Sequence, residues 1–438
     1  MVGLNFIPQP LRRLAFVIFI TVTARAAQAT PLDDYVHAPD TNFLWRVLDH
    51  RQQAGCTLTE IGFISQRWQG ILWTNVIWIV QPPELRHPEF AALIIGGDQD
   101  NAMLGEATGA ARRAGAWAVT LSRVPNQPFF NGRKEDALIA YSFEQCLRSG
   151  DDTWPLLLPM VKSAVRAMDL TQTWLAGEHL PKPEKFVVTG ASKRGWTTWL
   201  TAAVDPRVAA FAPRVFDMVN MKAQTDWAQL CYGHQSEQIH DYTDKGLIEA
   251  MGTPAMQRLC DSVDPYSYRD RYQMPKLILL GANDPYWTVD APRHYWNELP
   301  GEKLLFDAPN ATHSLNHDSV RTFAAFFQLV AEGKPLPELH WTMNGNDTPA
   351  VNVTFDRPAK QALLWTATAK TRDFRPAKWT SRKLPLTADV REVSAGLKQP
   401  AKGYLAFMVE LTFAAPAGDY KLSTQVQVTP DPPRPAKE

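Results

Sequence analysis

Between residues 91 and 306, short apolar runs alternate with longer segments of helical period. The apolar runs are bounded by turn residues, as buried strands are, and lie at residues 91–95, 117–121, 186–188, 208–213, 277–280 and 303–306. The segments of helical period are residues 102–114, 135–146, 159–175, 196–203 and 292–299. Before them, residues 58–66 and 71–80 favour an antiparallel pair of strands. This order predicts an α/β fold with a mostly parallel sheet and helices on both faces.

Two regions depart from that alternation. Residues 217–274 are rich in Tyr, Asp, Gln and Met, and an insertion at this point can form a helical lid over the carboxyl ends of the strands. Between residues 340 and 428 apolar residues recur at every second position, which predicts a small immunoglobulin-like β-sandwich. We therefore expect an α/β domain over residues 30–335, a sandwich over 336–429 and a disordered Pro-rich tail over 430–438.

The N-terminus has the pattern of a secretory signal. Arg12 and Arg13 precede an apolar stretch, residues 14–22, that is too short to span a bilayer, and Ala27-Gln-Ala29 is a small-x-small cleavage site. We predict a signal peptide cleaved after Ala29 and a secreted or periplasmic protein; an uncleaved anchor is the alternative. Because no later stretch reaches about 18 apolar residues, we expect no membrane span in the mature chain.

Charge and cysteine content limit the partners. The chain has 45 Lys and Arg against 45 Asp and Glu, and nucleic-acid binding requires a basic surplus, so we expect no nucleic-acid partner. Four cysteines in an oxidising compartment allow two disulfides. Cys231 and Cys260 share one segment and are the favoured pair, with four buried thiols as the alternative. Without a Cys/His cluster, we expect neither a metal nor a cofactor.

The motif that indicates chemistry is Gly190-Ala-Ser-Lys-Arg-Gly-Trp196, which joins the strand at 186–188 to the next helix. A serine at a sharp strand-to-helix turn is a nucleophile elbow, where the turn lifts the hydroxyl above the sheet. The motif departs from G-x-S-x-G, because Arg194 occupies the second position after Ser192 and the glycine follows one residue later. The alternative is an ordinary serine that caps the helix.

An activated serine requires a base, and the base requires an orienting acid. Asp284 follows the strand at 277–280, and His313 follows the last strand, so the chain order is Ser, acid, His, as in α/β-hydrolases. Asp290 is the fallback acid, since Asp284 could simply form a turn. His317 lies four residues after His313, a spacing that can hold zinc on a helix, but a third ligand is not in view.

The loop after residue 95 is predicted to complete an oxyanion hole. Gly96 and Gly97 allow backbone amides to approach a ligand closely. We expect the amide of Asp98 or Gln99 to act with the amide of Lys193, and Gly97 to contact substrate. The Lys193 side chain could add a positive charge there or pair with acids instead.

Two more stretches are expected to line the pocket. Residues 124–130 follow the strand at 117–121, the fourth predicted strand of the chain, and are too rigid and apolar for a random loop, and residues 226–232 lie in the insertion. For Phe129 and Trp227, a pocket wall and plain packing are equally consistent with the sequence. The residues assigned to substrate contacts, besides Gly97, are Asn126, Gln127, Phe129, Trp227 and Trp287.

Several long motifs together resemble one known family. They span residues 124–128, 135–141, 154–169, 190–200, 205–208 and 264–269. These segments resemble the PhoPQ-activated pathogenicity-related protein family, over about residues 35–425. The resemblance implies a secreted α/β-hydrolase with a triad at Ser192, Asp284 and His313, and members of the family are linked to virulence. One departure is that members often have Asp-Glu-Phe-Phe after the seventh strand, where this chain has Asn283-Asp-Pro-Tyr-Trp287.

The sequence therefore predicts an α/β-hydrolase with a lid insertion and a C-terminal β-sandwich. We expect a serine hydrolase that cleaves an ester or amide bond of a small-molecule, peptide or carbohydrate-ester substrate. A peptide-like substrate is favoured by the resemblance. The alternatives are a glucuronoyl-type carbohydrate esterase, a zinc hydrolase that uses His313 and His317, and a catalytically silent binding protein on the same fold.

Overall fold

The computed structural model describes residues 29–97, 101–345, 348–387, 390–416 and 418–432. The predicted signal peptide, except for Ala29, lies outside the described residues, as do Asp98 and Gln99. Signal-peptide cleavage and secretion stay predictions.

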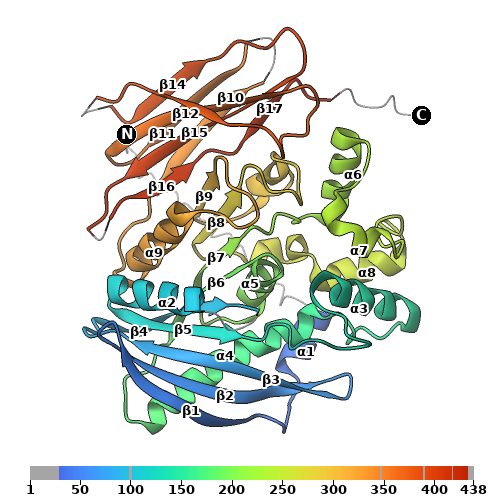
Figure 1. The fold of residues 1–438 in the computed structure, drawn as a ribbon, viewed down its shortest axis with the longest axis vertical. Helices are drawn as coiled ribbons and strands as arrows, with labels where there is room; N and C mark the ends of the chain where they lie inside the picture. The colour runs from blue at the N-terminus through green and yellow to red at the C-terminus, as the bar shows by residue number, and fades with distance from the viewer. Residues whose placement is uncertain (1–28, 98–100, 346–347, 388–389, 417, 433–438) are drawn as a thin grey trace, which may run out of the picture.

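A nine-stranded sheet forms the centre of the larger part of the molecule (Figure 1). Its strands in spatial order are β1 Leu44–Gln53, β2 Cys56–Trp68, β3 Ile71–Gln81, β5 Ala116–Ser122, β4 His87–Ile95, β6 Lys185–Ala191, β7 Val208–Arg214, β8 Lys276–Gly281 and β9 Lys303–Ala308. The first three strands and β5 pair antiparallel, and the remaining pairs from β5 to β9 are parallel. The predicted strands are confirmed. The edge strand β1 was not predicted, because most of its side chains are exposed and its sequence lacks a buried apolar run.

Helices cover both faces of this sheet. One face packs against α1 Pro31–His37, α3 Glu135–Ser149, α4 Leu157–Gly177 and α5 Lys193–Val204, and the other against α2 Asn101–Ala114 and α9 His317–Ala331. Alternate strand residues divide between these two cores, as in a sheet buried on both sides. The helix predicted at residues 292–299 is wrong: two 3₁₀ turns, η3 Ala291–His294 and η4 Trp296–Glu298, occur there, because Tyr295 has the non-helical φ of −147°.

The insertion between β7 and β8 contains short helices beside α3 (Figure 1). Its elements are α6 Met221–Tyr232, η1 Glu237–Ile239, α7 His240–Thr243, α8 Pro254–Val263 and η2 Pro265–Arg271. This position matches the predicted insertion, and it places the helices next to the carboxyl end of β7.

The C-terminal part consists of two antiparallel sheets, which Figure 1 shows beyond β9 and α9. One sheet has the order β10 Leu339–Asn344, β11 Ala350–Phe355, β14 Glu392–Gly396. The other has β13 Thr380–Lys383, β12 Ala359–Ala369, β15 Tyr404–Phe413 and β16 Tyr420–Ser423, with β17 Gln427–Thr429 also on β15. Apolar side chains of both sheets share one core, so the predicted β-sandwich is confirmed; its immunoglobulin-like type stays a prediction.

The tail begins with two placed residues. The Pro430 carbonyl accepts a hydrogen bond from Arg372, and Asp431 pairs with Arg293 at 3.1 Å. The start of the predicted disordered tail is thus held against the domains, whereas residues 433–438 lie outside the described residues.

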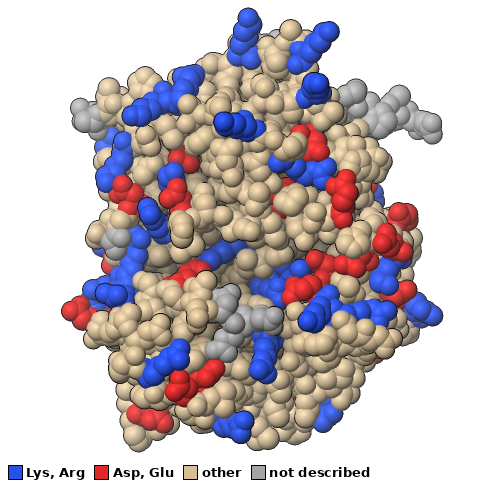
Figure 2. Space-filling view, viewed as in Figure 1, with Lys and Arg blue, Asp and Glu red and all other residues tan. Residues whose placement is uncertain are grey.

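The face of the molecule shown in Figure 2 carries basic and acidic groups side by side, as expected from the balanced composition. Within the described ranges, none of the helices is long and apolar enough to cross a membrane.

The predicted Cys231–Cys260 disulfide is wrong, because all four cysteines are free thiols. Cys231 lies on α6 close to Asp290 and Arg372, whereas Cys260 lies on α8 close to Asp264. The two side chains therefore face different surroundings, although they belong to one insertion. Burial raises the pKa of both thiols to about 12.

Candidate active site

Ser192 occupies the turn between β6 and α5. Its backbone has φ 58° and ψ −126°, and its amide donates a hydrogen bond to the Arg214 carbonyl of β7. A positive φ is uncommon for a residue other than glycine and indicates a turn that the surrounding structure enforces. The nucleophile elbow predicted from the sequence has this backbone geometry.

Two glycines around Ser192 are required by close backbone contacts. A Cβ atom at Gly190 would lie 2.6 Å from the Arg194 carbonyl oxygen, and one at Gly195 would lie 2.6 Å from the Arg214 carbonyl oxygen. Gly190 therefore allows the first turn of α5 to approach β6, and Gly195 allows α5 to approach β7. This explains the shifted glycine of the motif: the position that packs against the neighbouring strand is Gly195, one residue after Arg194.

The structure brings Ser192, His313 and Asp284 together. His313 Nε2 lies 2.8 Å from Ser192 Oγ, and His313 Nδ1 lies 2.7 Å from Asp284 Oδ2. Asp284 is almost fully buried, and its Oδ1 accepts a hydrogen bond from the Tyr286 amide, which fixes the carboxylate. Because a carboxylate only accepts hydrogen bonds, Nδ1 is the protonated nitrogen and Nε2 faces the serine hydroxyl as an acceptor.

Tyr286 and Trp287 pack around the imidazole. The Tyr286 ring stacks on His313 with centroids 4.3 Å apart, and Trp287 lies at 6.2 Å. Trp287 was predicted to contact substrate, whereas Tyr286 was missed. The signal for Tyr286 was its place two residues after Asp284, since a residue so close to the acid must lie near the base.

Charged side chains beside the elbow form a paired network. Glu135 accepts two hydrogen bonds from the Arg194 guanidinium, at 2.7 and 2.8 Å, and Lys193 Nζ lies 3.1 Å from Glu135. Although burial raises the pKa of Glu135, Arg194 and Lys193 outweigh burial and lower it to about 2. Lys193 also pairs with Asp136 at 2.9 Å, and Tyr242 donates to the other Asp136 oxygen at 3.0 Å. The Lys193 side chain was expected either to add a positive charge at the oxyanion hole or to pair with acids. In the structure it pairs with acids.

The predicted oxyanion hole is described only in part. Lys193 is the first residue of α5, so its amide lies at the helix N-terminus next to Ser192. Asp98 and Gln99 lie outside the described residues. A Cβ at Gly97 would lie 2.5 Å from Arg194 Nη2, so this glycine makes room for the Arg194 side chain on its way to Glu135.

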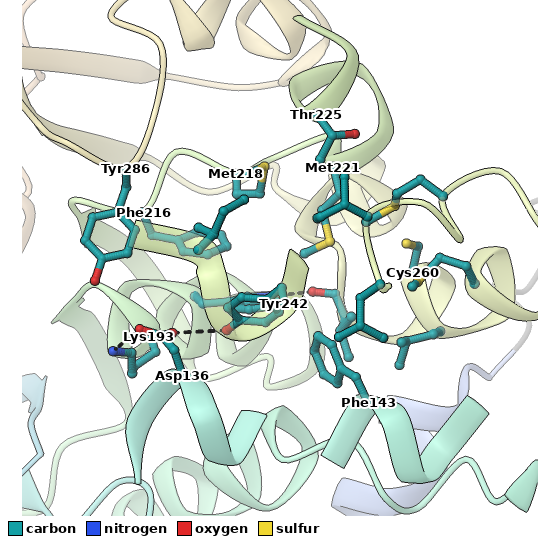
Figure 3. A pocket seen from close by; sticks show the side chains of 18 of the residues that line it. Asp136, Phe143, Lys193, Phe216, Met218, Met221, Thr225, Tyr242, Cys260 and Tyr286 are labelled. Carbon is teal, nitrogen blue, oxygen red and sulfur yellow. Dashed lines mark hydrogen bonds and ion pairs between the residues drawn. The ribbon is translucent and has the colours of Figure 1, made fainter. Parts of the chain in front are cut away.

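A pocket opens beside Ser192 and extends under the insertion (Figure 3). It holds about 740 Å³ of empty space, its open mouth included. Figure 3 shows Asp136 and Lys193 at one end of the pocket and Phe143 and Cys260 at the other. Its walls are mostly apolar and include four methionines that sequence reasoning missed: Met218, Met221, Met251 and Met256. The Met-rich composition of residues 217–274 was the available signal.

Of the predicted substrate contacts, Trp287 lines this pocket, whereas Gly97, Asn126, Gln127, Phe129 and Trp227 do not. Gln127 exchanges hydrogen bonds with Glu135, and Asn126 lies beside Thr74. Phe129 packs against Trp68 and Trp73 in an aromatic cluster. The indole of Trp227 donates to Asp290 at 3.0 Å. Gln127 thus supports the elbow through Glu135, and for Phe129 and Trp227 the packing interpretation agrees with the structure.

Asp290, the fallback acid, and His317, the second histidine of the zinc alternative, lie apart from the contacts between Ser192, His313 and Asp284. Asp290 pairs with Arg372 at 2.5 Å and Arg293 at 3.2 Å, so its carboxylate is occupied. His317 is exposed at the start of α9. In the described part of the chain, no three His, Cys, Asp or Glu side chains are grouped so that they could hold a metal ion.

Comparison with known proteins identifies the family of this chain. Residues 32–375 match a protein family described as PhoPQ-activated pathogenicity-related protein. The chain belongs to this family. Autocrine proliferation repressor protein A of Dictyostelium discoideum is 31% identical over 445 residues, which cover 92% of this chain and 90% of that protein. The family match includes Ser192, Asp284 and His313 and ends at Arg375, a few residues before β13.

Solved structures identify the fold. Acetyl xylan esterase 1 from a Thermoanaerobacterium species superposes with a TM-score of 0.50 at 15% sequence identity, covering 68% of this chain and 93% of that chain. At this identity the similarity concerns the fold, and this PhoPQ-related family member has the α/β-hydrolase fold with an added C-terminal β-sandwich.

Proposed function

We propose that the protein is a serine hydrolase that cleaves an ester or amide bond next to a large apolar group. The catalytic assignment rests on two consecutive hydrogen bonds. Ser192 Oγ lies 2.8 Å from His313 Nε2, and His313 Nδ1 lies 2.7 Å from Asp284 Oδ2. Both distances are within hydrogen-bonding range, which argues against the catalytically silent alternative.

Each group has a defined step. Ser192 Oγ attacks the substrate carbonyl carbon, and its proton moves to His313 Nε2. Asp284 holds the imidazole through Nδ1 and stabilises the imidazolium. The Lys193 amide donates to the oxyanion that forms on the carbonyl oxygen. His313 then protonates the leaving alcohol or amine, and a water molecule, deprotonated by the same imidazole, hydrolyses the acyl-enzyme.

The pocket supports an uncharged, apolar group on the substrate. Asp136 and Lys193 are the charged side chains among its lining residues, and they pair with each other, so neither is free for a charged ligand. The inner wall consists of methionines and other apolar side chains, and flexible methionines adapt to differently shaped apolar groups. A hydrophobic residue of a peptide fits this chemistry, whereas the hydroxyl-rich sugar of a glucuronoyl ester would require polar hydrogen-bonding partners along the wall.

The catalytic assignment is tested with a fluorophosphonate probe on the native protein. We expect covalent labelling that is lost in Ser192→Ala and in heat-denatured protein. Labelling that persists in Ser192→Ala would show that another nucleophile reacts, and an unlabelled native protein would support the silent binding alternative.

The substrate class is tested with p-nitrophenyl esters of N-acetyl-leucine and N-acetylglycine, of octanoate and acetate, and with a methyl glucuronoyl ester. We expect kcat/KM to favour the leucyl and octanoyl members by at least about tenfold, since each methylene buried in an apolar pocket contributes about 1 kcal/mol. Met251→Trp, which fills the pocket, should abolish that preference. Met343→Trp makes the same change in the sandwich and should keep it. Preference for the glucuronoyl ester would contradict the proposal.

A further inference from the structure

The acid and base of the site extend from an edge of the sheet. Asp284 follows β8, the strand next to the edge, and His313 follows β9, the last strand of the sheet; among the described strands, none pairs with β9 on its outer side. The two catalytic loops contact each other, because the Asn283 amide donates to the Ala311 carbonyl at 2.9 Å. Their outer side is covered by the sandwich loop, residues 371–379, which joins β12 to β13.

The sandwich loop binds the acid loop through Asn283. The Asn283 side-chain amide donates to three carbonyls of the sandwich loop, those of Phe374 at 3.3 Å, Arg375 at 3.0 Å and Ala377 at 2.7 Å. Asn283 directly precedes Asp284, so these bonds fix the backbone from which the carboxylate extends.

The same loop binds the base loop through Asn310. The Trp379 amide donates to Asn310 Oδ1 at 2.9 Å, and Asn310 Nδ2 donates to the Trp379 carbonyl at 3.0 Å. This reciprocal pair lies three residues before His313. Asn310 has φ 56°, a left-handed conformation that asparagine adopts more readily than most residues, so side chain and backbone both favour Asn here.

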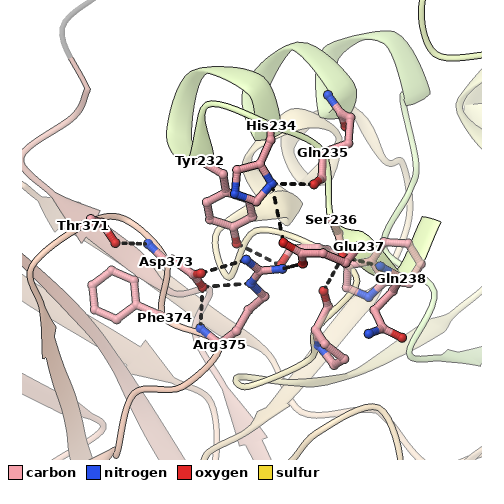
Figure 4. A network of polar contacts seen from close by, with 12 residues as sticks. Tyr232, His234, Gln235, Ser236, Glu237, Gln238, Thr371, Asp373, Phe374 and Arg375 are labelled. Atoms are coloured by element: carbon pink, nitrogen blue, oxygen red, sulfur yellow. Dashed lines mark hydrogen bonds and ion pairs between the residues drawn. The ribbon is translucent and has the colours of Figure 1, made fainter. Parts of the chain in front are cut away.

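The sandwich loop also contacts the insertion (Figure 4). Arg375 pairs with Glu237 at 2.9 Å and with Asp373 of its own loop at 2.7 Å, and its guanidinium lies 4.7 Å from the centre of the Tyr232 ring. Phe374 and Trp379 are buried in a small core with Ala282, the residue before Asn283. The loop is therefore anchored on both sides, and it connects both catalytic loops with the insertion.

We propose that the sandwich loop positions Asp284 and His313 relative to Ser192, so that the C-terminal sandwich is a working part of the hydrolase site. Asn283 and Asn310 are positioning residues: they act through the acid and the base. The kinetic consequences of this inference rest on the proposed function. The contacts themselves do not depend on which activity the protein has.

The test compares Asn283→Ala and Asn310→Ala with Lys378→Ala, an exposed residue of the same loop. Displacing a catalytic group by about 1 Å costs up to about 10²-fold in rate. We therefore expect kcat and the rate of fluorophosphonate labelling to fall about 10- to 100-fold in both asparagine variants, with KM changed less than about threefold. Lys378→Ala should match the wild type. Asn283→Asp should be as impaired as Asn283→Ala, because a carboxylate cannot donate to the three carbonyls.

A second measurement separates positioning from stability and from the proposed function. In the inactive Ser192→Ala background, hydrogen exchange should accelerate in residues 282–287 and 309–313 when Asn283 or Asn310 is replaced, and not in α5. If the alanine variants unfold, the same measurements are made on Asn283→Ser and Asn310→Ser. Unchanged kcat together with unchanged exchange would overturn the proposal, as would faster exchange throughout the fold. Faster exchange in the two loops supports it even if Ser192 proves not to be the nucleophile.

Discussion

The two halves of the candidate site are held in different ways. Ser192, the proposed nucleophile, lies at the end of β6, between β4 and β7 in the middle of the sheet, and the residues around it are supported by ion pairs within the same domain, Arg194 with Glu135 and Lys193 with Asp136. The acid and base lie towards the β9 edge and are supported by amide–carbonyl hydrogen bonds from a different domain.

The difference follows from the neighbours that each half has. A central strand has partners on both sides, so the elbow requires only short glycine contacts and nearby side chains. Among the described strands none pairs with the outer side of β9, and the sandwich packs against that side instead. We therefore expect substitutions near Asp284 and His313 to affect the sandwich as well, whereas substitutions around Ser192 should affect only the hydrolase domain.

The largest effect is expected for Asp284→Asn. The amide keeps the shape of the carboxylate but favours the wrong imidazole tautomer, so we expect kcat to fall about 10³- to 10⁴-fold. Asp290→Asn, at the fallback acid, should reduce kcat far less. The measurement is steady-state hydrolysis of the best ester. Equal losses in the two variants would contradict the assignment of the acid.

Next in size is the buried ion pair between the domains. Arg372 is buried against Asp290, and Arg372→Met should cost about 3 kcal/mol because it leaves the carboxylate without its main partner. Chemical denaturation measures this free energy of unfolding. Arg382→Met in exposed β13 is the matched control. The double variant with Asp290→Leu should recover part of the loss; a double variant less stable than Arg372→Met would contradict the pairing.

A smaller effect is expected at Glu135, on the nucleophile side. The Glu135 side chain is 37% exposed, so solvent weakens its ion pairs and Glu135→Gln should cost about 1 kcal/mol. Because the pKa of Glu135 is lowered to about 2, its contribution is present above its ordinary pKa of about 4.3 and is lost as the pH falls towards 2. Denaturation at several pH values should show that the difference in unfolding free energy between Glu135→Gln and the wild type becomes smaller in acid. Glu249→Gln is the exposed control, and a gap that widens in acid would contradict the pairing.

The smallest effect is expected at Asp307, the buried residue of β9 whose amide donates to Ser423 of the sandwich at 2.9 Å. Burial, with a smaller contribution from Asp284, raises the pKa of Asp307 to about 7. A raised carboxyl pKa means that stability falls as the pH rises from about 4 to 7. Asp307→Asn should therefore resemble the wild type near pH 4 and melt a few degrees (~3 °C) higher at about pH 8. Asp270→Asn, which is exposed, should show no such difference; a variant less stable than the wild type at alkaline pH would contradict the assignment.

Much of the hydrolase fold could be predicted from the sequence because its buried parallel strands are continuous apolar runs. The exposed edge strand β1 lacks such a run and was missed. The segment around Tyr295 has helical period but forms 3₁₀ turns, because period alone does not report backbone angles. The Cys231–Cys260 prediction failed because proximity along the chain does not determine which way two helices face.

For the candidate site, the sequence by itself predicted Ser192, Asp284 and His313, because each follows a recognisable strand in the order that this fold requires. Only the tertiary structure decided how they are supported. The pairing of Arg194 with Glu135 joins residues 59 positions apart, and Asn283 meets Ala377 94 positions away. Such contacts leave no local periodicity in a sequence, since they depend on how whole elements pack. The role that we propose for the sandwich loop follows from that packing alone.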